Sequence, residues 1–484
     1  MSDLAALDAT ASAELVRSGA VSALELVEAA RQRIERLDPQ LNALVRTRFD
    51  AAAGEAATAT GPFAGVPFLL KDLGALVAGE RTDFGSGVLK NSENRWAVTS
   101  YTSQAFANAG LVVLGRTATP EFGTTITTEP TAYAPTRNPW DPTRSAGGSS
   151  GGAAAAVASG MVPVAHASDG GGSIRIPASC CGLVGLKPSR GRVSNGPTVG
   201  ESWAGSTTDG ALARTVRDAA AMLDLLRAAM PGDPYIAPPV ARPYVDEVGR
   251  PLERLRVGLL TGPGRRRAPS PDAEVVDGVL SAGRLLSDLG HDVHEASPEA
   301  FVDEAYARHF LTVVVADVAL MMTQLERLLG RPIADDEIEP RNANYRRTGA
   351  RLAATDYLAA RGWLGQWARR MASWWAAPEQ GGQGFDLLVC PVIARVPPEI
   401  GWYTAGGPEQ EGGRIAEVLQ YTGQFNATGQ PALSLPLHTS SGGVPIGVQF
   451  VAAYGREDLL VRLASQLEQA QPWASRRPPL WSGR

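Results

Sequence analysis

The sequence predicts an α/β fold, and three features of the chain support that class. The first 60 residues have helical periodicity, residues 63 to about 230 alternate short apolar segments with long glycine-rich loops, and residues 255–295 form a strand-helix-strand unit. Such a unit implies parallel strands joined by a right-handed crossover. The chain has 484 residues, a length that large α/β proteins often fold as one unit.

The N-terminal helix has a defined start and end. Ser22 and Glu25 have the spacing of a capping box, and Asp38-Pro39 is expected to end the helix. The apolar residues between them recur on one face: Leu26, Val27, Ala30, Ile34 and Leu37. We therefore expect this helix to pack on the outside of the sheet.

The later elements follow in a regular order. Strands are expected at 110–114 and 161–167, and the proline-rich segment 230–252 is expected to be a surface connection. After it we expect a strand at 255–260, a helix at 272–289 closed by Gly290, a strand at 291–295, mostly helix at 300–376, a buried strand at 385–390, strands and turns up to 454, and a final helix at 457–468.

Composition and charge limit the expected partners. Hydrophobic residues make up 44% and charged residues 20% of the chain, and the formal charge is −5. These values are ordinary for a globular protein and give no electrostatic reason to expect binding to nucleic acid or to an anionic membrane. A small neutral molecule is the expected ligand.

The cysteines and the apolar segments predict a cytoplasmic protein. Cys180, Cys181 and Cys390 are odd in number and two are adjacent, which suits a reducing compartment. The N-terminus has no secretory signal pattern. The apolar run at 311–322 is interrupted by Asp317 and is shorter than the roughly 20 residues that a membrane span needs.

Lys71 is one of only three lysines, whereas 42 arginines carry the rest of the basic charge. Arginine stays protonated at any biological pH, but a buried lysine can lose its proton and act as a base. Lys71 follows the apolar run GVPFLL, which would bury it. The alternative is a lysine with a packed stem and an ammonium group in water.

Two serines lie in glycine-rich loops downstream of Lys71. Ser149 stands in RSAGGSSGGAAAAVASG, which runs into an alanine-rich helix as a linker would not, and no phosphate-binding G-x-x-x-x-G-K-[ST] pattern occurs. Ser173 follows Asp169 and three glycines, so we expect it at the tip of a turn whose backbone N–H groups can form an oxyanion hole. A simple glycine turn is the alternative.

No histidine or metal motif offers a simpler way to activate Ser173. His166 lies on the strand that leads into the loop and is equally compatible with the core, while His291 and His294 would point to opposite faces of a strand. Neither the H-E-x-x-H metal motif nor the S-x-x-K hydrolase motif occurs. The remaining candidate is a proton relay from Lys71 through one serine to another, which needs neither metal nor cofactor.

Taken together, GVPFLLKD, GGSSGG and DGGGSIRIPASCCGLVGLKPSRGRVS resemble the amidase signature family. The similarity extends over nearly the whole chain, including LARTVRD at 212–218 and NATGQPALSLP near the C-terminus. It implies a single α/β/α domain, residues 1–484, with a central mixed, twisted sheet flanked by helices. Its parts would be N-terminal helices at 1–60, a catalytic core at 61–230, a connection with the strand-helix-strand unit and a helical substrate-side region at 231–395, and C-terminal strands and helix at 396–484.

The same resemblance implies a role for each site residue. Lys71 would be the catalytic lysine, Ser149 the bridging serine after a cis peptide bond, and Ser173 the nucleophile. Gly170 replaces a side-chain-bearing residue of the family, so more room is expected above the substrate carbonyl. The backbone N–H groups of the oxyanion hole would be those of Gly170, Gly171, Gly172 and Ser173, and the residues that order the loop would be Asp169 and Arg175.

The resemblance also suggests a substrate class. The segments TTEP at 127–130, TRNPW at 136–140, RIPAS at 175–179 and VAAYGREDLL at 451–460 look most similar to 6-aminohexanoate cyclic dimer hydrolases, which open nylon by-product amides. Similar enzymes cleave aryl acylamides and carbamates. Thr124, Thr125 and Trp203 are expected to border the pocket. The residues expected to pack in the core instead are Trp363, Trp367, Trp374 and Trp375.

Two other functions remain as alternatives. The same signature occurs in the glutamine-hydrolysing subunit of tRNA-dependent amidotransferases, which would require partner subunits. A ligand-binding protein without activity is disfavoured because all three catalytic positions are filled. The family resemblance is also compatible with a homodimer.

Overall fold

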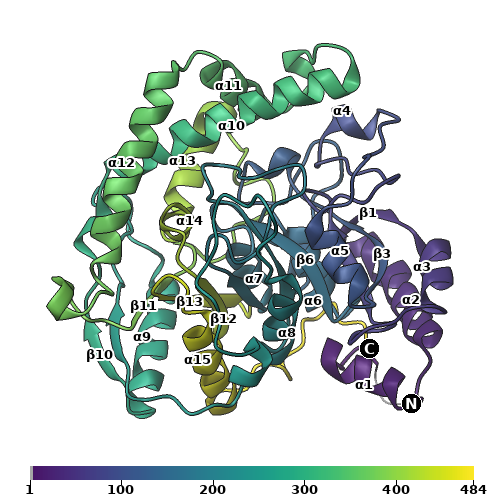
Figure 1. Cartoon of the computed structure of the whole chain (residues 1–484), viewed down its shortest axis with the longest axis horizontal. Coiled ribbons are helices and arrows are strands. Elements are labelled where there is room, and N and C mark those ends of the chain that lie inside the picture. Colours follow the sequence, from purple (N-terminus) through teal and green to yellow (C-terminus); the bar gives the residue numbers. More distant parts are fainter. Residues whose placement is uncertain (1–3, 484) are drawn as a thin grey trace.

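The computed structural model describes residues 4–483, and eight of their strands form one mixed sheet in the order β10-β9-β11-β13-β12-β7-β8-β6 (Figure 1). β9 runs parallel to β10 and β11, and the other neighbouring strands are antiparallel. The predicted α/β class with a mixed sheet is therefore confirmed. The strands are β6 (Val164–Asp169), β7 (Val184–Lys187), β8 (Thr208–Ala213), β9 (Arg256–Leu259), β10 (Asp292–Glu295), β11 (Leu387–Pro391), β12 (Ala432–Thr439) and β13 (Pro445–Ala452).

A separate three-stranded sheet carries Lys71. It consists of β1 (Leu44–Thr47), β3 (Val112–Thr117) and β2 (Pro67–Lys71), with β3 in the middle. All five residues of β2 are buried. The backbone N–H of Lys71 donates to Nδ1 of His166 on β6 at 3.3 Å, which joins the small sheet to the edge of the large one. A two-stranded ribbon consists of β4 (Arg137–Asn138) and β5 (Asp141–Ser145).

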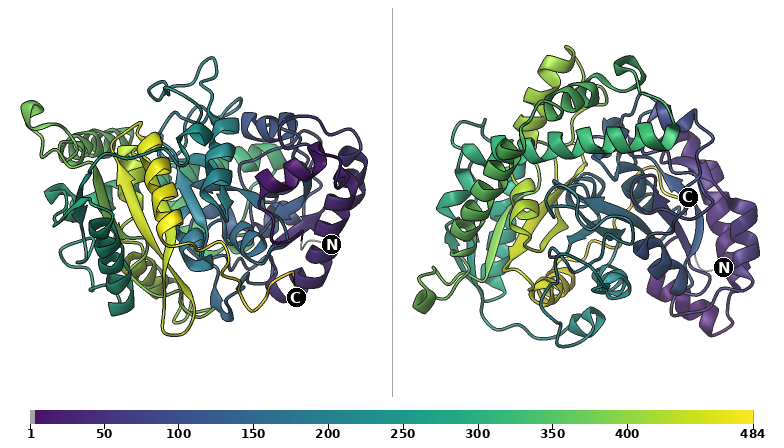
Figure 2. Two further views of the ribbon diagram at one scale, coloured as in Figure 1. Left: turned by 90° about the horizontal axis from the view of Figure 1, so that it is seen from below. Right: turned by 45° about the horizontal axis from the view of Figure 1, so that its top comes forward.

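Helices cover both faces of the large sheet (Figure 2). Neighbouring side chains of a strand point to opposite faces, so alternate residues of β6 enter different cores. Val164 joins the core that includes α8 and α15, whereas Ala165 and Ala167 join the core that includes α6 and α7. These helices are α6 (Gly151–Ala158), α7 (Arg175–Cys181), α8 (Val216–Leu226) and α15 (Glu457–Ala470).

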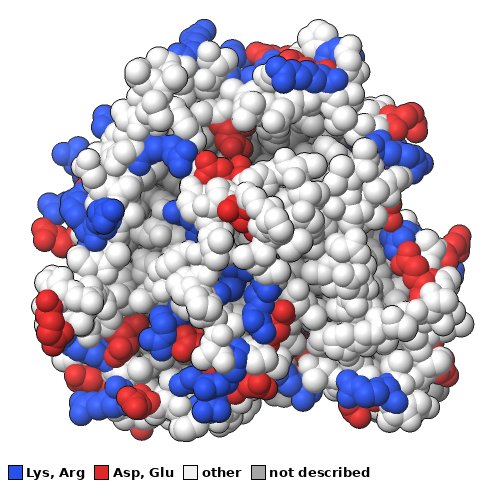
Figure 3. Space-filling view, viewed as in Figure 1, with Lys and Arg blue, Asp and Glu red and all other residues white. Residues whose placement is uncertain are grey.

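The other helices surround this centre. The N-terminal helices lie on the side of the chain termini, and α10, α11 and α12 lie on the opposite side (Figure 1). Charged side chains of both signs are interspersed on the face seen in Figure 3, in keeping with the small net charge. The bounds are α1 (Ala9–Arg17), α2 (Ala23–Leu41), α3 (Phe49–Ala56), α4 (Gly87–Lys90), α5 (Tyr101–Asn108), α9 (Ala273–Asp288), α10 (Ala305–Leu329), α11 (Pro340–Gly349), α12 (Ala354–Ala372), α13 (Pro408–Val418) and α14 (Gly423–Thr428).

α10 is the one helix in the described part of the chain that could cross a membrane by length and composition alone. It has 25 residues, and 33% of its most apolar stretch is buried inside the structure. Asp317, near its middle, accepts hydrogen bonds from the hydroxyl of Ser202 at 3.2 Å and the N–H of Trp203 at 3.1 Å. Asp317 therefore fixes the loop before β8 onto this helix.

The end of α2 differs from the expectation, although the capping box at its start is confirmed. The helix continues through Pro39 to Leu41 and stops where Asn42 adopts a left-handed conformation, with φ of 50°. Pro39 lies in the last turn, where its missing N–H removes only one helical hydrogen bond. The carboxylate of Asp38 accepts the next two backbone N–H groups after the cap, which stabilises this ending.

The predictions for the strand-helix-strand unit and the tryptophans are confirmed. β9, α9 and β10 follow one another, and the two strands pair in parallel. Trp367, Trp374 and Trp375 are buried, although α12 ends before the last two. Trp363 is half-buried and stacks on His309 with ring centroids 4.5 Å apart.

Candidate active site

Lys71 ends β2 and is completely buried. Its Nζ lies 2.7 Å from Oγ of Ser149 and 3.0 Å from Oγ of Ser168. Burial lowers the pKa of Lys71 to about 7, although the carboxylates of Asp209 and Asp169 act in the opposite direction. A substantial fraction of this lysine is therefore neutral near neutral pH, and its amine can accept a proton.

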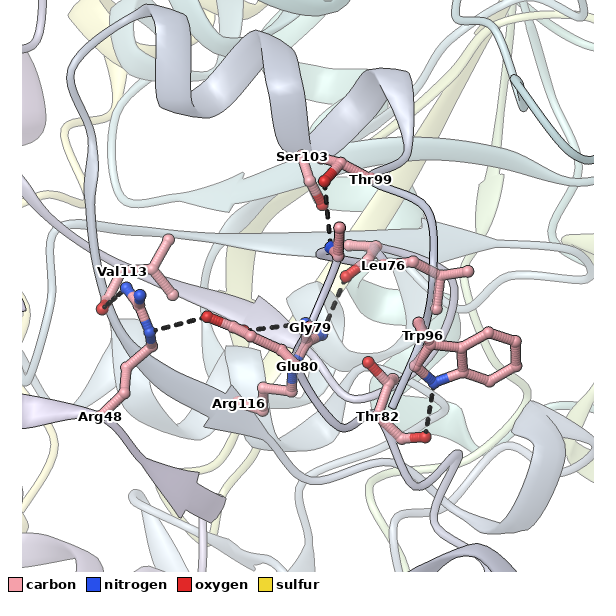
Figure 4. A network of polar contacts seen from close by, with 12 residues as sticks. Arg48, Leu76, Gly79, Glu80, Thr82, Trp96, Thr99, Ser103, Val113 and Arg116 are labelled. Atoms are coloured by element: carbon pink, nitrogen blue, oxygen red, sulfur yellow. Dashed lines mark hydrogen bonds and ion pairs between the residues drawn. The ribbon is translucent and has the colours of Figure 1, made fainter. Parts of the chain in front are cut away.

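A polar network holds the segment that follows Lys71 (Figure 4). Glu80 forms ion pairs with Nε of Arg48 at 3.1 Å and with Nη2 of Arg116 at 3.4 Å. Arg116 also donates to the carbonyl oxygens of Ala75 at 2.8 Å and Lys71 at 3.5 Å. Because Arg116 lies on β3, beside β2, it ties the strand end and the next loop to the small sheet.

Ser149 lies just before α6, and the peptide bond between Gly148 and Ser149 is cis. The residue is 2% exposed, and a Cβ placed on Gly123 would lie 3.3 Å from its Oγ. The neighbouring Ser150 has a different environment, because its Oγ donates to the carbonyl oxygen of Ser168 at 3.3 Å. The structure thus distinguishes the two serines of GGSSGG, and only Ser149 contacts the lysine.

Ser173 lies in the turn between β6 and α7 and is 8% exposed. Its hydroxyl makes no hydrogen bond with any group of residues 4–483. The hydrogen bond between Lys71 and Ser149 is therefore present, whereas the described residues show no hydrogen bond between the side chains of Ser149 and Ser173. Ser173 keeps a free hydroxyl beside the glycine turn.

Arg175 holds the carboxylate of Asp169 in a completely buried ion pair. Its Nε and Nη2 donate to the two carboxylate oxygens at 2.9 Å each. Burial by itself would raise the pKa of Asp169, but the charge and hydrogen bonds of Arg175 hold it well below its usual range. The remaining N–H groups of Arg175 donate at 2.6–2.9 Å to Thr422 O, Gln449 Oε1 and Asn426 Oδ1.

The carboxylate of Asp169 also shapes the glycine turn. It accepts the backbone N–H of Gly172 at 2.7 Å and that of Ile174 at 3.2 Å. Gly172, one of the four predicted oxyanion donors, is therefore already engaged. The other three predicted donors have no protein acceptor among the described residues: Gly170, Gly171 and Ser173.

The loop before β8 folds over Gly170. A Cβ on Gly170 would lie 3.0 Å from two ring carbons of Trp203 and 3.3 Å from the methyl group of Thr207. The absence of a side chain at Gly170 therefore leaves space that Trp203 approaches, and the greater room expected above the substrate carbonyl stays a prediction. Trp203 therefore lies beside the turn, and its ring also packs edge-on against Phe310 of α10, with centroids 6.3 Å apart.

We expect Gly170→Ala to lower the free energy of unfolding by about 1–3 kcal/mol, because the added methyl group must displace the ring of Trp203. Gly171→Ala is the matched control, since no atom lies within 4 Å of a Cβ there. We expect its stability to remain within about 0.5 kcal/mol of the wild type. Urea unfolding measures both, and equal midpoints for the two variants would contradict a close contact between Trp203 and Gly170.

The two predicted threonines lie in different environments. The hydroxyl of Thr124 donates to Oδ1 of Asn342 at 2.6 Å and accepts from Nε of Arg341 at 3.2 Å, so it is engaged with α11. The hydroxyl of Thr125 is buried and has no hydrogen-bond partner among the described residues. A buried hydroxyl without a partner is a group that a ligand can satisfy. Of the two hydroxyls, that of Thr125 is the one without a hydrogen-bond partner in the described part of the chain.

Sequence reasoning considered His166 without connecting it to Lys71, and it missed other polar groups near Lys71 and the turn. Ser168 and His166 both contact Lys71, and Nε2 of His166 lies 3.3 Å from Oδ1 of Asp209 on β8. The two-residue spacing of His166 and Ser168 on a strand was the available signal, since it places both side chains on one face. Nothing in the sequence connects Asp209 with them. Tyr306 of α10 was also missed, and its buried hydroxyl has no partner in the described chain.

A surface cavity of about 600 Å³ lies apart from these residues. Its lining includes charged residues of both signs and Trp374. None of its lining residues belongs to the groups around Lys71, Ser149 or the glycine turn.

Comparisons with known proteins give consistent matches over nearly the whole chain. A family model described as Amidase matches residues 25–461. A 6-aminohexanoate-cyclic-dimer hydrolase of a Pseudomonas species is 44% identical over 483 residues, which cover 98% of this chain and 96% of that protein. A solved 6-aminohexanoate cyclic dimer hydrolase complexed with substrate has a TM-score of 0.93 at 41% identity, covering 98% and 99% of the two chains. A bacterial aryl acylamidase of the amidase signature family has a TM-score of 0.86 at 28% identity, covering 97% of each chain.

Proposed function

The chain belongs to the amidase signature family, and we propose that it hydrolyses amide bonds through a relay of Lys71, Ser149 and Ser173. The family and its relatives make the chain a hydrolase of carbon–nitrogen bonds other than peptide bonds. One observation supports the relay most directly: the buried amine of Lys71, with its pKa lowered to about 7, lies 2.7 Å from the hydroxyl of Ser149.

In the proposed acylation step, neutral Lys71 takes the proton of Ser149 while Ser149 takes the proton of Ser173. Oγ of Ser173 then attacks the amide carbonyl carbon, and the carbonyl oxygen becomes an oxyanion. The free N–H groups of the turn are available to this oxyanion, and each such donor contributes on the order of 3 kcal/mol. We expect the hydrogen bond between the hydroxyls of Ser173 and Ser149 to form when substrate binds, because catalytic hydrogen bonds often tighten only in the complex with substrate.

In the proposed second half of the cycle, the tetrahedral intermediate expels the amine, which receives a proton from Ser149. Lys71 returns its proton to Ser149. Water then attacks the carbonyl carbon of the acyl-enzyme while its proton passes through Ser149 to Lys71. The ester bond to Ser173 breaks, Oγ of Ser173 regains a proton through the same groups, and the carboxylic acid is released. Every proton in this cycle moves among substrate, water and these three side chains.

We propose that the substrate is a small neutral amide with an apolar chain or ring. Trp203, Phe310 and Tyr306 form a continuous cluster of aromatic rings that begins against Gly170, with the last two rings stacked at 5.5 Å. A methylene chain or an aryl group bound beside Trp203 would pack against such rings. The buried hydroxyls of Thr125 and Tyr306 have no protein partner among the described residues, so either could hydrogen-bond a polar group of a substrate that reaches it. The relatives favour cyclic aminohexanoate amides first and aryl acylamides second. Linear aminohexanoate oligomers and carbamates, a urethanase-type activity, remain further candidates from the family resemblance.

We expect a fluorophosphonate probe to label the chain at Ser173, and we expect Ser173→Ala to abolish both this label and amide hydrolysis. The labelled residue is identified by peptide mass spectrometry, and hydrolysis is measured with 6-aminohexanoate cyclic dimer. Ser150→Ala is the matched control, because Ser150 bonds to the backbone of Ser168 rather than to Lys71.

Labelling at another serine, or full hydrolysis by Ser173→Ala, would rule out the assigned nucleophile. The same preparation distinguishes the substrate alternatives, with a nitroanilide, an aryl carbamate and glutamine assayed beside the cyclic dimer. A preference for glutamine together with co-purifying subunits would favour the amidotransferase alternative.

The cysteines support the expected cytoplasmic location. Cys180, Cys181 and Cys390 are unpaired and buried. Burial raises the pKa of Cys180 and Cys390 to about 12, which keeps these thiols protonated and unreactive. Unpaired structural cysteines are typical of a reducing compartment.

A further inference from the structure

We propose that Asp209, held in place by His166, sets the proton affinity of Lys71 and thereby the lower pH limit of activity. This inference rests on the proposed function, because it takes Lys71 as the base of the relay. Asp209 would act through Lys71 and is therefore a positioning residue.

The strand register places Asp209 next to the lysine. Asp209 on β8 lies directly opposite Ser168 on β6 in an antiparallel pair, and residues paired in this way project to the same face. Oγ of that same Ser168 lies 3.0 Å from Nζ of Lys71. A Cβ on Gly74, in the loop after β2, would lie 3.9 Å from Oδ1 of Asp209. The carboxylate thus faces the end of β2.

His166 lies between the backbone of Lys71 and the carboxylate of Asp209. Its Nδ1 accepts the backbone N–H of Lys71 at 3.3 Å, and its Nε2 lies 3.3 Å from Oδ1 of Asp209. The ring is completely buried and packs edge-on against Phe106, with centroids 6.0 Å apart. His166 therefore connects the strand end that carries Lys71 with Asp209.

The two carboxylates near Lys71, those of Asp169 and Asp209, differ in whether a positively charged side chain pairs with them. Asp169 is neutralised by Arg175 in the buried ion pair. Asp209 instead accepts from the hydroxyl of Thr102 on α5 at 2.9 Å and lies 3.3 Å from Nε2 of His166. No lysine or arginine of residues 4–483 forms an ion pair with it. Of the two carboxylates, Asp209 is thus the one without a guanidinium or ammonium partner in an ion pair among the described residues.

Two further charged residues, Asp72 and Arg116, lie close to Lys71, but they interact with backbone groups rather than with its amine. Asp72 accepts the backbone N–H groups of Asp83 at 3.0 Å and Gly85 at 3.5 Å. Arg116 donates to the backbone carbonyl of Lys71 rather than facing its amine. Asp209 is accordingly the first charge that raises the pKa of Lys71 against the larger effect of burial. Without it, Lys71 would be neutral at lower pH but would also be a weaker base.

The test measures the rate of fluorophosphonate labelling of Ser173 as a function of pH, which requires no knowledge of the natural substrate. In the wild type we expect the rate to fall in acid as Lys71 becomes protonated. In Asp209→Asn, which keeps the shape of the side chain, we expect this acidic limb to move to lower pH by about one unit, with a lower plateau rate.

Two variants serve as controls for this shift. Asp209→Glu retains the charge and is expected to leave the limb near its wild-type position. Thr102→Val removes a neutral contact of Asp209 and is expected to leave the limb unchanged. A lower plateau in Asp209→Asn with an unmoved limb would mean a merely structural or substrate-binding role, and would overturn the inference while leaving the relay intact. Wild-type labelling by Lys71→Met would overturn the relay and the inference together.

Discussion

Lys71→Met should lower kcat/KM for amide hydrolysis by about ten-thousand-fold, the scale seen when one member of a nucleophile-activating unit is removed. Methionine fills much of the volume of the lysine stem but cannot accept the proton of Ser149. Lys71→Ala should lose as much activity while also leaving a cavity in the core. Hydrolysis of 6-aminohexanoate cyclic dimer measures the loss, and circular dichroism verifies that the fold remains.

Lys187→Met is the matched control for this experiment. Lys187 is also a buried lysine, and burial likewise lowers its pKa to about 7. Among residues 4–483, its Nζ donates only to the carbonyl oxygen of Pro188, at 2.8 Å. We expect this variant to keep activity of the wild-type order. Equal losses in both variants would attribute the effect to removing any buried lysine, and near-full activity of Lys71→Met would refute the relay.

Arg175→Met should destabilise the fold by about 3–5 kcal/mol at neutral pH, because it leaves the charge of Asp169 buried without a partner. Three further acceptors, from Thr422, Gln449 and Asn426, lose their donor at the same time. Activity should fall as well, since Asp169 shapes the turn through Gly172. Urea unfolding at several pH values measures the change.

The pH dependence of this loss has a defined sign. In the wild type, Arg175 holds the pKa of Asp169 below its ordinary value, and the resulting stability is present above that ordinary value and disappears only in strong acid. In Arg175→Met burial raises the pKa instead, so the deficit should be largest at neutral pH and shrink as the pH falls through the raised value. Adding Asp169→Asn removes the stranded charge and should recover part of the stability. A double variant no more stable than Arg175→Met would contradict this explanation.

The scarcity of lysine drew attention to Lys71, and the apolar run before it predicted its burial, but neither feature could identify the base. Two of the three lysines, Lys71 and Lys187, are completely or almost completely buried and have similarly lowered pKa values. What separates them is the partner, a serine hydroxyl for Lys71 and a backbone carbonyl for Lys187. Partners lie far apart in the chain, so composition cannot reveal them.

Local chemistry was readable from the chain alone, because short motifs specify backbone turns and the groups that they carry. The burial of Lys71 behind an apolar run, the glycine turn before Ser173 and the parallel strand-helix-strand unit all follow from neighbouring residues. The tertiary structure alone decided which contacts these groups make. The Trp203 ring lies beside Gly170, α11 engages Thr124, and strand pairing brings Asp209 opposite Ser168. Each of these contacts joins segments that only the packing of sheets and helices brings together, and no local pattern records that packing.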